Sequence, residues 1–261
     1  MMNKREEKRG QITIFIIVGI IIVALAVLIY LFYPKISSIF ITESKNPSQY
    51  LQSCMEDSVI NSVKTISLQG GSINPEHYFL YDSNKIEYLC YSESYYAQCV
   101  NQQPLLKEHI EEEIKNFVKS DAQNCLAKMR DSYINKGYSV NLGSGNFNVE
   151  LLPKRISFVF NSSLTIAKEG AENYKSVSFG IDNNLYDLIS IANSIVNWEA
   201  RYGDAETTTY MNYYHDLQVE KKKQTDGTKI YILTDRNNGN KFQFASRSVA
   251  WPPGYGIAGT Y

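Results

Sequence analysis

Residues 8–34 read KRGQITIFIIVGIIIVALAVLIYLFYP, a run with no charged residue after its first two positions. The apolar part, residues 12–32, would extend about 31 Å as a helix, roughly the thickness of the hydrocarbon core of a bilayer. The residues before it hold more Lys and Arg than Asp and Glu, and basic residues stay preferentially in the cytoplasm. We therefore expect a basic cytoplasmic segment over 1–10 and a transmembrane helix over 11–33 that contacts the lipid bilayer through 12–32. Everything after it should lie outside the cell.

A cleaved secretory signal peptide is an alternative explanation of this run. Such peptides have an apolar region of roughly 7–15 residues, followed by a small-residue cleavage site. The run here is longer, and its small-x-small match, Ala24-Leu25-Ala26, lies inside it. Tyr30 and Tyr33 are placed as an interfacial aromatic belt, and Pro34 ends the helix, so the run predicts a retained anchor.

A third interpretation of the run comes from a resemblance. Lys8-Arg9-Gly10-Gln11 before a long apolar helix resembles the class III signal of archaeal prepilins and archaellins. In that family a membrane peptidase cuts on the cytoplasmic side of the helix, which then packs into a filament core. The resemblance implies cleavage near Gly10-Gln11 and a pilin-like subunit. Many such pilins have an acidic residue near the fifth mature position, where this chain has Phe15.

The composition describes a folded exterior part. Of the 261 residues, 44% are hydrophobic and 20% are charged, which is typical of a globular protein rather than a disordered stalk. The net charge is −1, and because the first ten residues contribute +2, the part beyond the span carries about −3. This balance gives no electrostatic case for binding nucleic acid.

The four cysteines are an even number in an oxidising compartment, which favours two disulfides. Cys90 and Cys99 flank a short polar and aromatic segment, whereas Cys54 and Cys125 each lie on the apolar face of a predicted helix. Of the three connectivities, we expect the pairs 90–99 and 54–125. Zinc is the alternative, but no Cys-x-x-Cys occurs and the three His are scattered, so neither a metal nor a cofactor is predicted.

Beyond the anchor, the apolar periodicity predicts an α+β fold of about three helices with antiparallel hairpins and a meander. Helices are expected over 48–68, with Ser48 as the N-cap, and over 104–135 and 185–201. Strands are expected over 78–81, 85–91, 146–152, 155–166, 175–181, 217–221, 229–234 and 241–246, with a weaker segment after residue 91. The change of period divides the exterior into a helix-rich part, 34–139, with a Cys-flanked β segment, and a β-rich part, 140–261, with one helix and a Gly/Pro tail.

The inner face of the second helix is predicted from its apolar spacing, with one polar interruption at Asp121. The stripe consists of Leu106, Ile110, Ile114, Phe117, Asp121, Cys125, Met129 and Ile134.

No residue set predicts catalysis. His109 lies near Glu111, Glu112 and Glu113, but the zinc motif His-Glu-x-x-His is absent and these acids are expected on a solvated face. Asp235, Asn237 and Gly239 have the spacing of a calcium loop, yet the later Glu is missing and a hairpin turn explains them. Gly143-Ser144-Gly145 is expected to be a plain loop. Nothing predicts that His77, His109 and His215 meet.

Tyrosines gather in two segments, Tyr78 to Tyr96 and Tyr210 to Tyr214. Because Tyr is enriched at interfaces, they predict a contact surface for a protein or a glycan. The alternative is that many of the rings fill a strand-rich core. Asn161-Ser162-Ser163 is a glycosylation sequon, with Asn161 as the acceptor.

A second resemblance covers roughly the first half of the chain. Tyr50-Leu51-Gln52-Ser53-Cys54, Leu68-Gln69-Gly70-Gly71 and Cys125-Leu126, together with the Lys-Arg-Gly-Gln start, resemble a group of uncharacterised membrane-anchored proteins of small-genome archaea. The resemblance implies a surface protein and supplies no catalytic residue. We therefore expect a single-pass cell-envelope protein with an extracytoplasmic structural or interaction domain. The alternatives are a pilin-like subunit and an envelope enzyme whose site is assembled from distant residues.

Overall fold

The computed structural model describes residues 17–24 and 46–252. The chain divides into two units, 1–45 and 46–261, and each is described by itself. In the first unit, residues 17–24 are helical and their apolar side chains are exposed. Among the described residues, no helix is both long enough and apolar enough to cross a membrane.

Several expectations fall outside the described residues. They are the cytoplasmic segment 1–10, the Gly10-Gln11 junction, Phe15, and the expected transmembrane helix except for residues 17–24. The end of the expected Gly/Pro tail, 253–261, also lies outside them.

Two long helices, α2 (Pro47–Leu68) and α3 (Leu106–Asn135), pack along each other in the second unit. The predicted cap of α2 is wrong, because Asn46 is the N-cap and its side chain accepts a hydrogen bond from the Ser48 backbone N at 3.0 Å. Pro47 occupies the first turn, where its missing N–H has no intrahelical partner to lose. Ser48 therefore supplies the capped N–H, not the capping oxygen.

The buried stripe of α3 differs from the predicted one in its middle and at its end. Phe117 and Ile134 are exposed, while Val118, Ala122 and Tyr133 are buried. The stripe follows four-residue steps from Leu106 to Ala122, so Val118 and Ala122 take the places predicted for Phe117 and Asp121. Fully burying a Leu or Ile side chain stabilises the fold by about 1.5–3 kcal/mol, so this stripe is a main source of stability.

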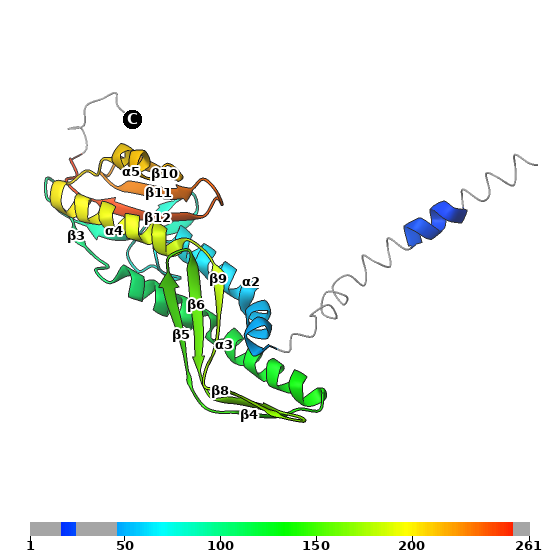
Figure 1. Ribbon diagram of the computed structural model, residues 1–261. Coiled ribbons are helices and arrows are strands. Elements are labelled where there is room, and N and C mark those ends of the chain that lie inside the picture. The colour runs from blue at the N-terminus through cyan, green and yellow to red at the C-terminus, as the bar shows by residue number, and fades with distance from the viewer. Residues whose placement is uncertain (1–16, 25–45, 253–261) are drawn as a thin grey trace, which may run out of the picture. The chain divides into compact units, whose positions relative to one another are not determined.

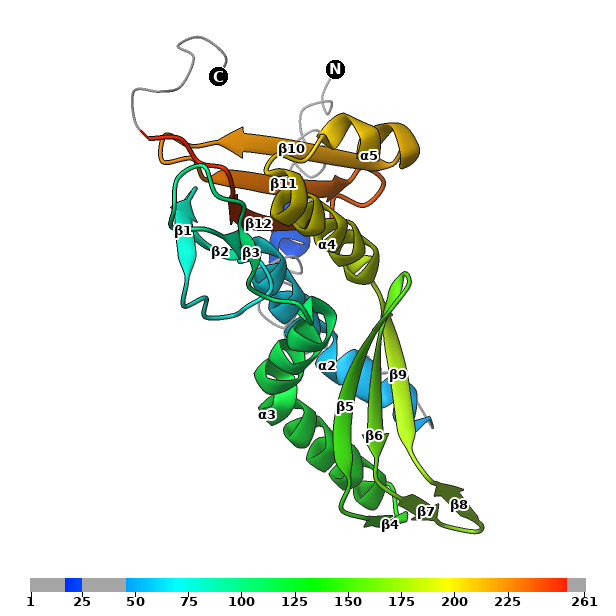
Figure 2. The same ribbon diagram turned by 90° about the vertical axis from the view of Figure 1, so that its left-hand side faces the viewer.

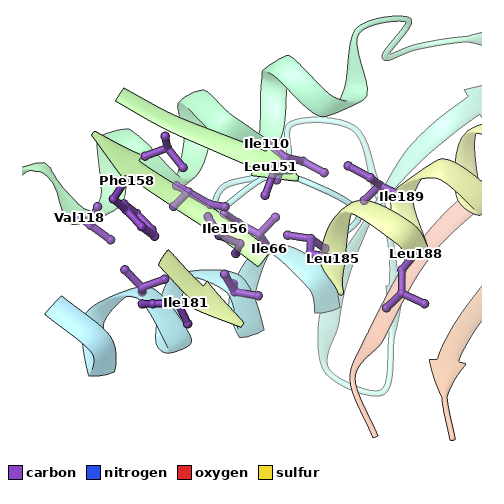
Figure 3. Close-up of a cluster of buried hydrophobic side chains, with 14 of the residues drawn as sticks. Ile66, Ile110, Val118, Leu151, Ile156, Phe158, Ile181, Leu185, Leu188 and Ile189 are labelled. Carbon is purple, nitrogen blue, oxygen red and sulfur yellow. The ribbon is translucent and has the colours of Figure 1, made fainter. Parts of the chain in front are cut away.

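A three-stranded sheet packs against this helix pair. Its antiparallel order is β5 (Asn146–Leu152), β6 (Arg155–Asn161) and β9 (Val177–Asp182). Alternate residues of β6, including Ile156 and Phe158, are buried, as the period of a half-buried strand requires. Figure 2 shows these strands running alongside α2 and α3, and Figure 3 shows the apolar side chains that meet between them.

A smaller sheet continues from the ends of these strands. Its order is β4 (Ser139–Leu142), β7 (Leu164–Ala167) and β8 (Ala171–Tyr174). The predicted single strand 155–166 is wrong, since the chain leaves β6 after Asn161 and joins another sheet as β7. β4 and β8 were not predicted, because their side chains are mostly exposed and give little alternation in the sequence.

The third sheet joins the two ends of the unit. Its order is β1 (Tyr78–Tyr81), β2 (Asn84–Tyr91), β12 (Lys241–Arg247), β11 (Lys229–Asp235) and β10 (Leu217–Lys223), with β3 (Val100–Asn101) pairing with β2. The pairing of β2 with β12 is parallel, and the other pairs are antiparallel. This sheet therefore contains strands from both sides of the predicted division at residue 139.

Helix α4 (Leu185–Tyr202) lies across β11 and β12 (Figure 1). The six apolar residues predicted for its inner face are all buried: Leu185, Leu188, Ile189, Ala192, Ile195 and Val196. A short helix, α5 (Thr207–Tyr213), lies beside β10 and buries none of its residues. It therefore has no apolar periodicity from which it could be predicted. The fold of this unit is α+β, as predicted.

Candidate functional site

A groove of about 1040 Å³ opens where several turns meet at the surface of the second unit. Its lining comes mainly from the β9–α4 junction, the first half of α4, α5 and the residues after it, and the β11–β12 turn. Ile60 of α2 and Lys154 of the β5–β6 turn complete it. Asp, Asn and Tyr side chains are prominent in this lining. Its volume is close to the upper limit of small-molecule sites, which is roughly 1,000 Å³.

The rim of the groove is held by a network of amides around one carboxylate. Asp235 Oδ2 accepts hydrogen bonds from Asn184 Nδ2 at 2.6 Å and from Asn238 Nδ2 at 3.1 Å. Asn240 Nδ2 donates to Asn184 Oδ1 at 2.7 Å, and Asn237 N donates to Asp235 Oδ1 at 2.8 Å. These bonds join the β9–α4 junction to the β11–β12 turn. The groove therefore has one wall whose side chains are already oriented.

The same network decides between the two interpretations of the Asp235 segment. Both carboxylate oxygens of Asp235 accept N–H donors, and Gly239 takes the left-handed φ of 74° that the turn requires. A hairpin turn thus accounts for these residues. Within the described residues, no three His, Cys, Asp or Glu side chains come together as a metal site.

Other polar groups of the groove remain open to a ligand. Asp182, Asp216 and Asn237 are exposed, and no hydrogen bond or ion pair of their side chains occurs within the described part of the chain. Lys154 is the one basic residue of the described lining, which also contains four Asp residues. The charged side chains of the described lining therefore carry net negative charge.

Three tyrosines from α4, α5 and the residue after α5 line the groove: Tyr186, Tyr210 and Tyr214. The Tyr210 hydroxyl lies 2.9 Å from Ser194 Oγ, which fixes that ring relative to α4. Tyr214 is 46% exposed and contacts the Tyr213 ring edge to face, with 4.8 Å between centroids. Two of the tyrosines predicted as a contact surface, Tyr210 and Tyr214, thus belong to the groove.

The first tyrosine segment is divided between core and surface. Tyr88 is buried and its hydroxyl lies 2.8 Å from Thr228 Oγ1, whereas Tyr78, Tyr95 and Tyr96 are exposed. Burial raises the pKa of Tyr88 to about 12, against the opposing effect of the Thr228 hydrogen bond. Tyr88 therefore belongs to the core, while a contact role for the exposed rings stays a prediction.

His109 does approach a serine and a carboxylate. Its Nε2 lies 2.8 Å from Ser72 Oγ, which donates to Glu87 Oε2 at 2.5 Å. Burial raises the pKa of Glu87, although the Ser72 hydrogen bond opposes that shift. A Ser–His–acid relay needs the imidazole between the serine and the acid, but here the serine is in the middle. The arrangement ties the α2–β1 loop to β2 and α3.

Two of the three acids after His109 are not on a solvated face, contrary to expectation. Glu113 Oε2 accepts a hydrogen bond from Ile73 N at 2.7 Å, and Glu111 Oε1 accepts one from Leu151 N at 2.7 Å. Only Glu112 is exposed, and it pairs with Lys115. The carboxylates of Glu111 and Glu113 therefore join α3 to neighbouring backbone.

The three histidines have different neighbours. His77 packs against the rings of Tyr88 and Tyr91, at 4.7 and 4.2 Å between centroids. His215 is exposed, and its carbonyl accepts a hydrogen bond from Arg236. His109 instead contacts Ser72, with 2.8 Å between Nε2 and Oγ.

A buried charged cluster was missed by the sequence analysis. Glu199 has no exposed surface, and its Oε2 accepts from Lys229 Nζ at 2.7 Å and from Ser246 Oγ at 3.0 Å. Its Oε1 accepts from Ala205 N at 2.9 Å and from the Tyr231 hydroxyl. Burial and the Glu199 charge raise the pKa of Tyr231. The cluster joins α4 to β11 and β12 and is closed to solvent.

The structure contains the two disulfides that the sequence favours. Cys54–Cys125 joins α2 to α3, with 5.9 Å between the Cα atoms, and Cys90–Cys99 closes the loop after β2, at 5.3 Å. Both distances are normal for disulfides. All four cysteines of the chain are therefore paired.

The sequon and the glycine loop lie next to each other. Asn161 is exposed at the end of β6, where an acceptor must be accessible. A Cβ on Gly145 would lie 2.2 Å from Asn161 O, and one on Gly143 would lie 2.5 Å from Ser163 Oγ. Close approach of backbone therefore explains Gly145, and close approach of a serine side chain limits position 143, in agreement with a plain loop.

No known protein family, no curated protein and no solved structure matches the chain.

Proposed function

We propose that the chain is a single-pass membrane-anchored protein of the cell envelope. Its basic N-terminus lies in the cytoplasm, the apolar segment 12–32 lies in the bilayer, and the unit from Asn46 onward acts outside the cell. The observation that carries the proposal is the pairing of all four cysteines in two disulfides, since such bonds persist in oxidising compartments. The uncharged run after Arg9 supplies the anchor.

The role of the exterior unit is interaction rather than catalysis. Its groove presents exposed Asp and Asn side chains and tyrosine rings, which are groups that hold a ligand. The polar clusters outside the groove bind parts of the protein to one another. Glu199 accepts four hydrogen bonds from this chain, and Ser72 connects a carboxylate to His109.

Membrane extraction tests the anchor. Protein from native membranes should resist extraction by alkaline carbonate and should require detergent for release. A matched chain that begins at Asn46 and is directed outside the cell by a cleavable signal should be released without detergent. Release of the full-length protein by carbonate alone would contradict the proposal.

A pilin-like subunit is the second candidate, favoured by the Lys8-Arg9-Gly10-Gln11 segment. The mass of the mature N-terminus separates the two. A retained anchor gives an N-terminus at Met1 or Met2, whereas a processed subunit begins near Gln11 and should form filaments visible by electron microscopy. We expect the unprocessed N-terminus, because Phe15 replaces the acidic residue common in such pilins.

A further inference from the structure

We propose that the groove between α4, α5 and the β11–β12 turn binds a short neutral oligosaccharide. This inference names the ligand class of the interaction site and so rests on the proposed function. It is carried by three properties of the groove, namely its hydrogen-bonding groups, its charge and its aromatic rings.

The open polar groups match the chemistry of sugar hydroxyls. A hydroxyl both donates and accepts a hydrogen bond, and neighbouring hydroxyls on a sugar ring need partners of both kinds. The Asn237 amide offers a donor and an acceptor, and the carboxylates of Asp182 and Asp216 offer acceptors. These three side chains are exposed and make no hydrogen bond or ion pair within the described residues. A sugar would therefore displace water from them but no protein contact.

The charge of the groove selects against anionic ligands. Asp182, Asp187, Asp216 and Asp235 face a single basic side chain, Lys154, in the described lining. Asp235 is already bonded to two amides, but the open carboxylates of Asp182 and Asp216 would repel phosphate, sulfate or uronate groups. Nucleic acid and acidic glycans are disfavoured for the same reason, so among glycans the groove favours neutral ones.

The aromatic rings supply the apolar contact that a sugar ring needs. One face of a pyranose carries mainly C–H groups, and it packs on a flat aromatic ring that keeps a polar tip. Tyr186, Tyr210 and Tyr214 line the groove, and Tyr210 is fixed by its 2.9 Å contact with Ser194. Tyr214 is 46% exposed, so its ring has surface to offer a ligand.

The size and rigidity of the groove favour an oligosaccharide over a single sugar or a protein. The volume of about 1040 Å³ is at the upper limit for small-molecule sites. It is larger than a single sugar ring requires. The bonds among Asn184, Asp235 and Asn240 orient one wall before a ligand arrives, so little ordering is required on binding. Protein interfaces are depleted of Asp at their centre, whereas this groove contains four.

Binding to a sugar panel tests the inference. The full-length chain is purified in a detergent without a sugar head group and applied to immobilised neutral gluco-, manno- and galacto-oligosaccharides, with uronate and sulfated oligosaccharides alongside. The best neutral probe is then titrated by calorimetry. We expect saturable binding of a neutral probe and no preference for the acidic ones.

Matched variants assign that binding to the groove. Tyr214→Ala and Asn237→Ala should each weaken the affinity about tenfold, because each removes a direct ligand contact. Tyr202→Ala and Asn212→Ala are the controls, since both residues are exposed and lie outside the lining, and they should leave the affinity unchanged. Circular dichroism and intact disulfides verify that every variant is folded.

Several results would overturn the inference. They are the absence of neutral oligosaccharide binding, a preference for acidic oligosaccharides, saturable binding of Ca²⁺ alone, or equal affinity of groove and control variants. Because the purified chain is used, each of these results leaves the proposed membrane anchoring intact, and a failure of the anchoring experiment leaves the sugar result standing.

Discussion

Glu199 lies on the same face of α4 as Ile195 and Val196, one turn further along the helix. Its burial is stable because Lys229, Tyr231, Ser246 and a backbone N–H all donate to its carboxylate. An isolated carboxylate there would be costly, since burial of an unpaired charge in an apolar interior is strongly unfavourable. Apart from the nearby Ala205, its partners lie on strands 30 or more residues further along the chain. The apolar periodicity of α4 alone therefore predicts a surface position for this acid.

Replacing Lys229 tests how much this cluster contributes to stability. Lys229→Met removes the cation and leaves the Glu199 carboxylate buried, so we expect the free energy of unfolding to fall by about 3–5 kcal/mol. Lys223→Ala is the control, because Lys223 is half exposed and pairs with Asp204 at 3.5 Å, and it should cost less than about 1 kcal/mol. Urea denaturation followed by circular dichroism measures both. Equal losses of stability in the two variants would contradict a special contribution of the buried Lys229–Glu199 pair.

The carboxyl group of Asp204 is expected to make the stability of the fold depend on pH. Burial by itself raises the pKa of its carboxyl, but the Lys221 hydrogen bond and the charges of Lys229, Lys221 and Lys223 outweigh burial and lower the pKa below 3.8. Because the pKa in the folded state is below that in the unfolded state, its stabilisation is present above pH 3.8 and is lost as the pH falls through the folded value.

The variant Asp204→Asn measures that dependence. It should be less stable than the wild type at neutral pH by up to about 1 kcal/mol, since the carboxylate is half exposed. The difference should vanish in acid, in unfolding curves recorded across the pH range. A difference that stays constant down to the lowest pH would contradict the assignment.

The long elements follow from sequence because each buries a regular apolar face. The predicted inner face of α4 is buried in full, and the hairpins after residue 216 lie within two residues of their predicted ends. Short elements are different. β4, β8 and α5 bury few or no side chains, so contacts with neighbouring elements rather than their own pattern determine them.

The break between β6 and β7 illustrates the same limit. Apolar alternation continues across Ser162-Ser163, so the sequence predicts one strand where the structure has two. Gly145 packs closely on the backbone of Asn161 and Ser162 at this break, where a Cβ would collide with it. The signal for the break is therefore in another part of the chain.

A pair of glycine substitutions tests that packing. Gly145→Ala places a Cβ 2.2 Å from Asn161 O, so the two segments must separate, and we expect a loss of about 1–3 kcal/mol. A Cβ on Gly170 would meet nothing within 4 Å, so Gly170→Ala should change stability by less than about 0.5 kcal/mol. Thermal unfolding of the two variants compares them. Equal melting temperatures would refute the close approach.

The disulfides act at the scale of elements as well. Cys54–Cys125 spans a separation of 71 residues and Cys90–Cys99 spans 9, so chain entropy predicts stabilisation of about 4 and about 3 kcal/mol. The double variant Cys54→Ser/Cys125→Ser should therefore lose more stability than Cys90→Ser/Cys99→Ser. Chemical denaturation measures it, and an inverted order would contradict the entropic account.

At the scale of the whole unit, the parallel pairing of β2 with β12 brings together residues more than 150 positions apart. No local pattern predicts that pairing, since alternation identifies strands but not their partners. The groove has the same origin, because the packing of α4 against the sheet brings Asn184 to Asp235 and Asn240, more than 50 positions away. Clustering in the sequence singled out Tyr210 and Tyr214, which line the groove, while Asp182, Asp216 and Asn237 carried no signal that distinguished them from turn residues.

Labelling of lysines on intact cells tests the central claim, that the folded unit lies outside the cell. Lys119 and Lys175 are exposed and form no ion pair within the described residues, whereas Lys229 is 5% exposed and serves as the internal control. A membrane-impermeant amine reagent should modify Lys119 and Lys175 in intact cells and leave Lys229 unmodified until the protein is denatured, as read by peptide mass spectrometry. Modification of Lys119 and Lys175 only after the cells are lysed would contradict the account.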